Sequence, residues 1–434
     1  MNSYRRIFGV LMLTMVTMVV VAQSGTNSPY SQYGFGILSE QGGGANRGMN
    51  GLGIGFHNKD QVNILNPASY SKIDSLTFLF DVGVSGQNTN FKEGLNKVNA
   101  KNADFEYAIA GFRAAKGVGV SFGIIPFTNI GYDYYNKTYM ESDKSSYYTN
   151  TYSGSGGIHQ VYLGAGWEPI KNFSIGANLS YLWGDLSRSV VNSYSNSYIN
   201  TLSKYYDYTV NSYKIDLGIQ YIHQITKKDF LTLGFTYGLG HKIGAEPNCQ
   251  VISTNPSTSV SDTTSYTLNN NVLKLPTMYG VGLQWNHDNK LKFGFDYTLQ
   301  KWGSVEYPEY KVVNNKAEYT LSGNMLMDRH KFTFGGEYTP DETKRSLLSR
   351  IHYRGGVSYS TPYIKVNGQD GPKEISASLG FGIPITNTYN NRSLLNISGQ
   401  WVHSSGNNMI IENTLRINIG ITFNERWFMK WKFE

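Results

Sequence analysis

The sequence is poor in several features that define whole classes of protein. It contains one cysteine, Cys249, and 12 prolines, and only 16% of its 434 residues are charged. A single cysteine excludes a disulfide scaffold. The lack of repeated apolar runs of about 20 residues excludes a bundle of transmembrane helices. An aromatic content of 14% excludes a disordered chain.

Glycine and tyrosine are abundant instead. The chain has 47 glycines among 434 residues, which is about 11%, compared with roughly 7% in average proteins. Its 33 tyrosines outnumber its 21 phenylalanines. Together with the scarcity of proline, this composition favours a large all-β protein.

The N-terminus has the pattern of a secretory signal. Two arginines precede an apolar stretch over residues 7–21, and Val20 and Ala22 fit a cleavage site of small residues. We therefore expect a signal peptide over 1–22, and, since no cysteine follows the cleavage site, an exported protein rather than a lipoprotein. Removal of two arginines lowers the net charge from +7 to +5, which is too mild for a nucleic-acid-binding protein.

The rest of the chain alternates between apolar and polar residues. Segments 172–183, 291–300 and 374–383 each place apolar side chains on one face and Gly, Ser, Asn or charged side chains on the other. Strict alternation predicts β-strands with one apolar and one polar face. The apolar faces are Phe173, Ile175, Ala177, Leu179, Tyr181 and Trp183; Leu291, Phe293, Phe295, Tyr297 and Leu299; and Ile375, Ala377, Leu379, Phe381 and Ile383.

A soluble β-sandwich also alternates, so the fold depends on which face is inside. The polar faces are made of small residues, and the apolar faces often end in an aromatic residue. Apolar side chains outside, polar ones inside and aromatic ends are typical of a barrel in lipid. The aromatic ends are Tyr181, Trp183, Tyr279, Trp285, Tyr353 and Tyr359.

The pattern predicts a transmembrane antiparallel β-barrel of about fourteen strands, an even number as in bacterial single-chain barrels. Short connections alternate with long ones, as expected for periplasmic turns and extracellular loops. The predicted strands cover 75–86, 104–114, 117–130, 157–168, 172–187, 208–224, 229–243, 275–287, 290–304, 328–340, 349–360, 373–385, 393–404 and 410–424.

Two regions lie outside the predicted barrel of residues 75–424. Residues 23–74 are rich in Gly, Asn and Ser and are too long for a simple tail, so we expect them to form a plug, or hatch, inside the lumen. Irregular backbone is tolerated there because polar groups of the barrel and water satisfy it. Residues 425–434 are expected to end the last strand or form a short periplasmic tail.

Five stretches resemble the FadL/OmpP1/TodX family of outer-membrane transporters for hydrophobic compounds, and the resemblance covers most of 28–434. Their order along the chain carries the likeness. They are the Gly-rich N-terminal segment ending in Asn66-Pro67-Ala68, GIIPFTNIGY (123–132), GSGGIHQVYLGAGWEPIKNFSIGANLSYLWG (154–184), FDYTLQKWG (295–303) and YRGGVSYS (353–360). The long Tyr-rich outer loops depart from the family's pattern, which leaves the ligand open.

The resemblance implies a mechanism. A hatch ending at Asn66, Pro67 and Ala68 plugs the lumen, and a hydrophobic or amphipathic molecule, such as a long-chain fatty acid, is captured by the outer loops. The molecule enters a luminal pocket and leaves sideways into the membrane through a gap beside a kink in the third strand. Residues predicted to form this kink are Gly123, Pro126, Phe127 and Gly131, and Pro126 must break a ladder hydrogen bond there.

Each of these residues also has a simpler explanation. Pro126 could be a distortion near the rim, and Asn66-Pro67 an ordinary turn. Arg354 and Arg416 could bind a ligand carboxylate in bidentate fashion. They could instead belong to a mutually neutralising polar interior, together with Asp81, Glu106, Lys214, Asp216, Lys292, Asp296, Lys331 and Glu337.

No pattern predicts catalysis, a metal or a cofactor. The eight histidines are dispersed without metal-ligand spacing, and no serine lies in a G-x-S-x-G elbow. We therefore expect a non-enzymatic protein of the outer membrane of a Gram-negative-type bacterium. The first hypothesis is a passive transporter whose partners are hydrophobic or amphipathic molecules and outer-membrane lipid. The alternative is a structural barrel in a protein secretion or assembly complex, with protein partners bound through its extracellular loops or C-terminal tail.

Overall fold

The computed structural model describes residues 25–141, 145–269, 271–386 and 392–425. The predicted signal peptide over 1–22 and nearly all of the predicted C-terminal region 425–434 lie outside these residues. In the described part of the chain, no helix is both long and apolar enough to cross a membrane.

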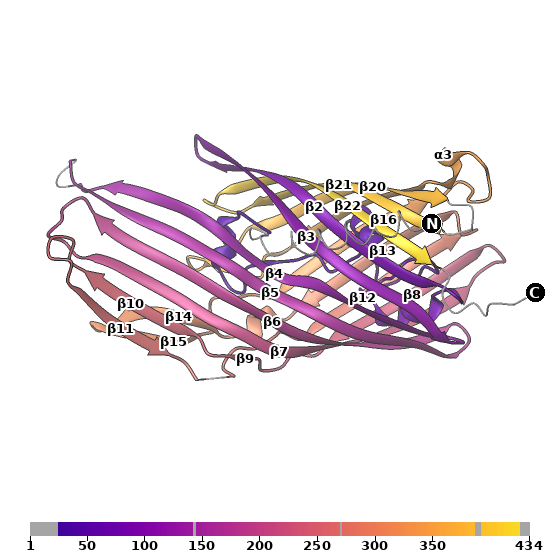
Figure 1. Ribbon diagram of the computed structural model, residues 1–434, viewed down its shortest axis with the longest axis horizontal. Helices are drawn as coiled ribbons and strands as arrows, with labels where there is room; N and C mark the ends of the chain where they lie inside the picture. The colour runs from indigo at the N-terminus through magenta and orange to yellow at the C-terminus, as the bar shows by residue number, and fades with distance from the viewer. Residues whose placement is uncertain (1–24, 142–144, 270, 387–391, 426–434) are drawn as a thin grey trace, which may run out of the picture.

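Fourteen antiparallel strands form a closed barrel (Figure 1), which confirms the predicted fold class and strand number. The first barrel strand pairs with the last, Phe78 opposite Glu425, and this seam closes the ring. The barrel strands are β2 (Phe78–Glu93), β3 (Asn96–Ala115), β4 (Val118–Tyr139), β5 (Tyr147–Ile170), β6 (Phe173–Tyr194), β7 (Thr201–Gln224), β8 (Asp229–Gly238), β12 (Met278–His287), β13 (Leu291–Gln300), β16 (Arg329–Tyr338), β17 (His352–Ser360), β20 (Lys373–Thr386), β21 (Arg392–Ser405) and β22 (Ile411–Glu425).

The remaining elements are short. Before the barrel come η2 (Pro29–Gln32), β1 (Ile37–Leu38), α2 (Gly44–Gly48) and η3 (Pro67–Lys72). The long connections contain β9 (Gly244–Ala245), β10 (Asn248–Thr254), β11 (Ser261–Thr267), η4 (Trp302–Ser304), β14 (Tyr307–Val313), β15 (Lys316–Ser322), β18 (Lys365–Val366) and β19 (Gln369–Asp370), and α3 (Leu347–Arg350) lies in a connection at the opposite end.

Side chains are oriented as the alternation predicts. Leu179, Phe295 and Leu379 are 59%, 43% and 71% exposed on the outside of the barrel. Asn178 and Asp296, their neighbours in sequence, are buried inside. The protein therefore turns its apolar surface toward lipid, and the soluble sandwich is excluded.

Aromatic residues mark both edges of the apolar surface. Near the long connections, the rings of Tyr181 and Trp183 stack with centroids 6.1 Å apart, and Tyr279 packs against Tyr237 at 5.5 Å. Near the short turns, Trp285 stacks on Phe293 at 6.3 Å. These two belts are the positions where aromatic side chains contact the membrane interfaces.

Strands β4 to β7 are longer than predicted and extend further at the left of Figure 1 than the other barrel strands. Strand β6 runs to Tyr194, eleven residues beyond Trp183, which is roughly 35 Å along the strand. Strand β7 also pairs with β10, and β10 with β11, in segments that we had predicted as loop. The extension escaped prediction because Ser, Thr, Asn and Tyr occupy both of its faces, so no apolar alternation identifies it.

Candidate functional site

The N-terminal segment 25–77 packs against inward-facing side chains from several sides of the barrel. On β13, the Asp296 carboxylate accepts hydrogen bonds from the backbone N–H groups of Gly53 and Ile54 at 2.7 and 2.8 Å. On β7, Gln220 donates to the carbonyls of Ile54 and Phe56 at 2.9 and 3.0 Å. These contacts hold irregular backbone among buried polar groups without leaving it unpaired.

Asn66, Pro67 and Ala68 form the start of η3. The Asn66 side chain caps this helix by accepting a hydrogen bond from the Ala68 N–H at 3.1 Å. Its amide also donates to the carbonyl of Ile54 at 2.9 Å and to that of Ile219 on β7 at 3.1 Å. The motif is therefore both a capped turn and a contact between the segment and the wall, and all three residues are buried.

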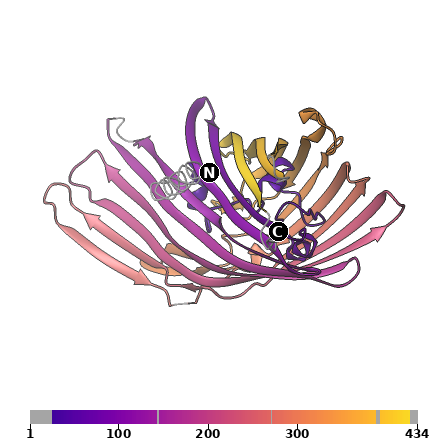
Figure 2. The same ribbon diagram turned by 45° about the vertical axis from the view of Figure 1, so that its right-hand side comes forward.

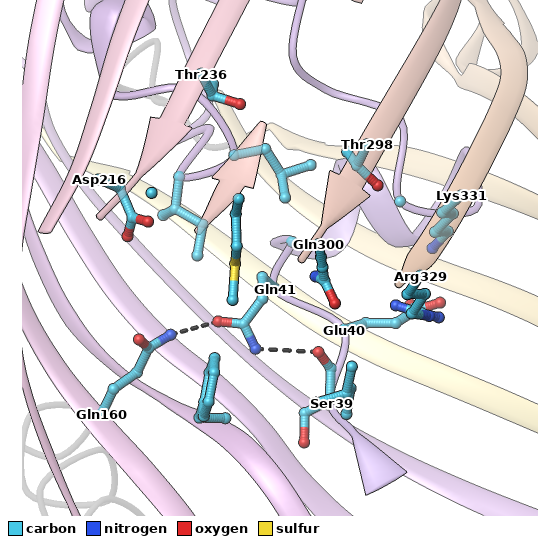
Figure 3. A pocket seen from close by; sticks show the side chains of 18 of the residues that line it. Ser39, Glu40, Gln41, Gln160, Asp216, Thr236, Thr298, Gln300, Arg329 and Lys331 are labelled. Atoms are coloured by element: carbon cyan, nitrogen blue, oxygen red, sulfur yellow. Dashed lines mark hydrogen bonds between the residues drawn. The ribbon is translucent and has the colours of Figure 1, made fainter. Parts of the chain in front are cut away.

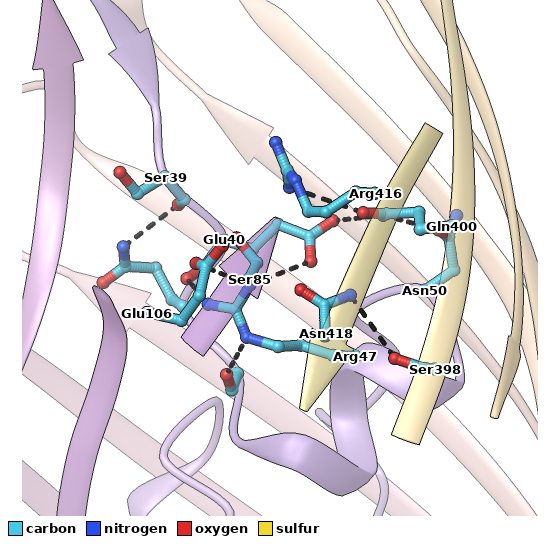
Figure 4. A network of polar contacts seen from close by, with 12 residues as sticks. Ser39, Glu40, Arg47, Asn50, Ser85, Glu106, Ser398, Gln400, Arg416 and Asn418 are labelled. Carbon is cyan, nitrogen blue, oxygen red and sulfur yellow. Dashed lines mark hydrogen bonds and ion pairs between the residues drawn. The ribbon is translucent and has the colours of Figure 1, made fainter. Parts of the chain in front are cut away.

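A buried ion network joins the same segment to the wall (Figure 4). Arg47 on α2 is 1% exposed and lies 2.8 Å from the Glu106 carboxylate on β3. It also donates to the carbonyls of Gly42 and Glu40 at 3.0 and 2.9 Å. The Glu40 carboxylate in turn accepts from Gln400 on β21 at 2.7 Å.

Sequence reasoning missed Arg47 and Glu40. They are the only Lys, Arg, Asp or Glu residues between 25 and 58. The segment is irregular and Gly-rich, so no periodicity assigns its residues to a face. The signal that could have identified this pair is that one acid and one base stand alone in an otherwise uncharged stretch.

The wall changes where the kink was predicted. Strand β3 pairs with β4 only as far as Ile124, the partner of Ala108. Beyond it, the pairing of β4 with β5 is irregular between Pro126 and Thr128, so that Phe127 forms a bulge. Gly123 lies in the paired part, opposite Ile109.

The N-terminal segment occupies the space where β3 and β4 separate. Strand β1 pairs with β4, with Ile37 opposite Asn129. The Ser39 N–H donates to the Phe127 carbonyl at 3.0 Å, and Gln41 donates to the Pro126 carbonyl at 2.9 Å. This edge of β4 is therefore contacted over a few residues by the N-terminal segment rather than by its neighbouring strand β3.

A luminal cavity of about 300 Å³ lies beside these residues (Figure 3). Ile37, Leu38, Phe127 and Met278 supply apolar walls. Charged side chains line the rest of the cavity, so the cavity is amphipathic rather than purely apolar. They are the bases Lys214, Arg329, Lys331 and Arg416 and the acids Glu40, Asp104, Glu106, Asp216, Asp296 and Glu374.

The two predicted carboxylate-binding arginines differ in their surroundings. Arg354 is buried, donates to Glu337 at 2.7 Å and to Asn396 at 2.7 Å, and does not line the cavity. Arg416 lines the cavity, and among the described residues its hydrogen-bond acceptors are side-chain amides, Gln87 at 3.1 Å and Gln400 at 3.4 Å. Of the two, Arg416 is placed to meet a ligand, and its role stays a prediction.

A packed apolar cluster crosses the outer end of the barrel above the cavity. It joins Phe35 of the N-terminal segment to Trp302 and Tyr363 of the long connections, with ring centroids 5.5 Å and 5.0 Å from that of Trp302. Arg188 on β6 lies beside it and donates to the Tyr307 hydroxyl at 2.7 Å. These particular residues of the long connections are thus used in packing.

Two toluene transporters and a FadL homologue are among the solved structures with the same fold. The Pseudomonas putida toluene transporter TodX matches with a TM-score of 0.59 and 13% identity over 90% of this chain and 100% of that one. The Ralstonia pickettii toluene transporter TbuX gives 0.57 and 15% over 89% and 99%. A Pseudomonas aeruginosa FadL homologue gives 0.60 and 11% over 89% and 99%. The protein thus has the FadL-type barrel fold, as the sequence motifs suggested.

A match to a family model assigns the chain to one family, which the fold alone does not do. The BamG family model matches residues 4–434, essentially the whole chain, and the protein belongs to the BamG family. No relative among curated proteins matches the sequence.

Proposed function

We propose that this BamG protein is an accessory barrel that binds other proteins at its extracellular end, within an outer-membrane secretion or assembly complex. The observation that carries this proposal is the sheet of β4 to β7, β10 and β11, which continues past the outer aromatic belt. A small-molecule channel has no need of a sheet roughly 35 Å long outside the membrane, whereas a protein partner requires an interface of about 800 Å² per side.

The lumen supports the same proposal. Its cavity of about 300 Å³ is lined by ten charged side chains as well as apolar ones, so an entirely apolar solute would be buried partly against charged groups and would gain less than in a purely apolar pocket.

Co-purification tests the proposed function. Extracted in mild detergent at native abundance, the full chain should elute with at least one protein in a constant molar ratio, measured by native mass spectrometry. In one variant, the β10–β11 hairpin, residues 248–267, is replaced by a short Gly-Ser turn. This variant should retain less of the co-purifying protein than the wild type does. Purification as a lone barrel carrying only bound fatty acid would contradict the proposal.

A second function, uptake of amphipathic molecules with lateral release, is favoured by the separation of β3 from β4 at Ile124 and the adjacent cavity. On this hypothesis the bulge at Pro126 and Phe127 keeps the wall open to lipid. Each buried CH₂ is worth roughly 0.8 kcal/mol, so lateral release spares an acyl chain a passage through water.

Replacing Pro126 tests this second function. Pro126→Val restores a backbone N–H and a strand-forming residue, so uptake of a fluorescent fatty acid by whole cells should fall several-fold. Pro384→Val, a strand proline of β20 far from the gap in sequence, serves as the matched control and should leave uptake unchanged. Equal uptake by both variants would exclude release at this position.

A further inference from the structure

The extracellular part of β4 has an open edge. Above the outer belt, β4 pairs with β5 as far as Tyr139, while its pairing with β3 has ended at Ile124 and that with β1 at Asn129. The β2–β3 hairpin and β4 diverge from this point, as both ribbon views show (Figures 1 and 2). The upper part of β4 therefore forms one side of a notch in the rim.

The direction of the free backbone groups follows from Gly131. Its N–H donates to the Ser31 hydroxyl at 3.2 Å, and its carbonyl accepts from the same hydroxyl at 3.4 Å. Both groups thus point away from β5. Because the two backbone groups of successive residues alternate between the sides of a strand, those of Asp133, Tyr135, Lys137 and Tyr139 point the same way.

These edge groups have no partner within the described residues. No hydrogen bond from the β3 side reaches the backbone between Asp133 and Tyr139, and the Tyr135 and Tyr139 side chains are 71% and 56% exposed. An unpaired edge of this kind is a template for another strand, and proteins normally cover it or blunt it. Seven residues are enough for a strand of ordinary length.

The chain itself demonstrates that this edge accepts a strand. Lower on the same side, β1 pairs antiparallel with β4 at Thr128 and Asn129, although β1 comes from a segment that does not belong to the barrel ladder. The added strand would continue this pairing outward.

Charge indicates what the added strand carries. The opposite side of the notch is the outer part of β3, whose Asp104 accepts a hydrogen bond from Asn129 at 3.2 Å. Beyond that contact, β3 carries the exposed residues Lys97 and Lys101. The β2–β3 hairpin also carries one further base, Lys92, and one acid, Glu93. On β4, Lys137 is balanced by Asp133, so the excess positive charge lies on the hairpin side of the notch, and that side attracts acidic side chains.

We propose that the β4 edge from Asp133 to Tyr139 binds an extended, acidic segment of a partner protein by strand addition. The proposal rests on the accessory function above and names the surface and the kind of partner. Main-chain hydrogen bonds supply the affinity, and the lysines of the β2–β3 hairpin select acidic sequences.

The test uses the purified full-length barrel and a defined probe. The probe is a fluorescein-labelled peptide of about nine residues that alternates threonine and valine and carries two aspartates; binding is followed by fluorescence anisotropy. A second peptide of the same sequence, N-methylated at alternate residues, cannot pair. We expect the first peptide to bind and the second to bind at least roughly tenfold more weakly, because each lost hydrogen bond costs about 1 kcal/mol.

Two variants at one position locate the site. Tyr135→Pro removes an edge-facing N–H without touching the β5 ladder and should weaken binding roughly fivefold, the equivalent of about 1 kcal/mol. Tyr135→Thr removes the same ring but keeps the N–H, and should bind like the wild type. Correct folding is checked for both by the heat-dependent mobility of the barrel in detergent gels.

Three results would overturn the proposal: equal binding of the N-methylated peptide, equal binding by Tyr135→Pro, or equal loss in Tyr135→Thr. Failure of the accessory function is a separate outcome. If the native partner still co-purifies with Tyr135→Pro, the accessory function stands and the strand-addition site does not. If no partner co-purifies with the wild type, the accessory function fails, and the peptide series still decides whether the edge accepts a strand.

Discussion

Replacement of Arg47 by methionine is expected to release the N-terminal segment from the wall. The substitution leaves the Glu106 carboxylate, 8% exposed and 2.8 Å from the lost guanidinium, buried without its cation. Breaking a buried pair by removing one partner typically costs about 3–5 kcal/mol. The equilibrium constant for docking of the segment should therefore fall by more than about a hundredfold, since 1.4 kcal/mol is a factor of ten.

Chymotrypsin digestion of the folded barrel measures this release. Phe35, Phe56 and Tyr70 are buried in the wild type and should be cleaved only in Arg47→Met, with a rise in ion conductance across planar bilayers. Lys59→Met removes an exposed cation from the same segment and should change neither readout. Resistance of Arg47→Met to the protease would show that the ion network does not hold the segment.

Gly176→Val is expected to displace the Asn66-Pro67-Ala68 turn. A Cβ at Gly176 on β6 would lie 2.4 Å from the Pro67 carbonyl carbon and 2.5 Å from the Ala68 nitrogen. Both are backbone atoms that cannot move aside independently, so the turn must shift or the strand must bend. Overpacking of this kind costs typically 1–3 kcal/mol and more for a rigid neighbour.

The expected result is cleavage by chymotrypsin near Tyr70 while the barrel retains its heat-dependent mobility. Gly86→Val on β2 is the matched control, because nothing lies within 4 Å of a Cβ there. If both variants resisted cleavage equally, the turn would not depend on close approach to β6, and its assignment as a hatch motif would lose its physical basis.

The barrel could be predicted from the sequence because lipid imposes a strict rule on it. Every residue of a spanning strand faces either hydrocarbon or lumen, so the alternation around Leu179 and Phe295 identified strands and their orientation. The same alternation predicts which charged residues face the lumen. Two of them, Glu337 and Arg354, lie directly opposite each other on β16 and β17.

The extension above the belt and the N-terminal contacts were not predictable in this way. Ser153 and Ser189, which share a hydrogen bond of 2.7 Å on neighbouring strands, lie where both faces meet water, so burial leaves no period in the sequence. Arg47 is buried by contacts with residues 42 and 106, which an irregular segment brings together without any repeat. Alternation appears in a sequence only where the two faces of a strand meet different surroundings, such as lipid and the lumen. Neither of these regions has two such faces.

The seam between Phe78 and Glu425 also constrains the order in which this protein is built. Residues 25–77 precede β2, and their polar contacts reach β3, β7, β13 and β21. If β2 and β22 paired first, this N-terminal segment would have to enter an already closed barrel through one of its ends. We therefore expect the sheet to close around its own leading segment, so that docking of this segment and pairing of β2 with β22 are coupled.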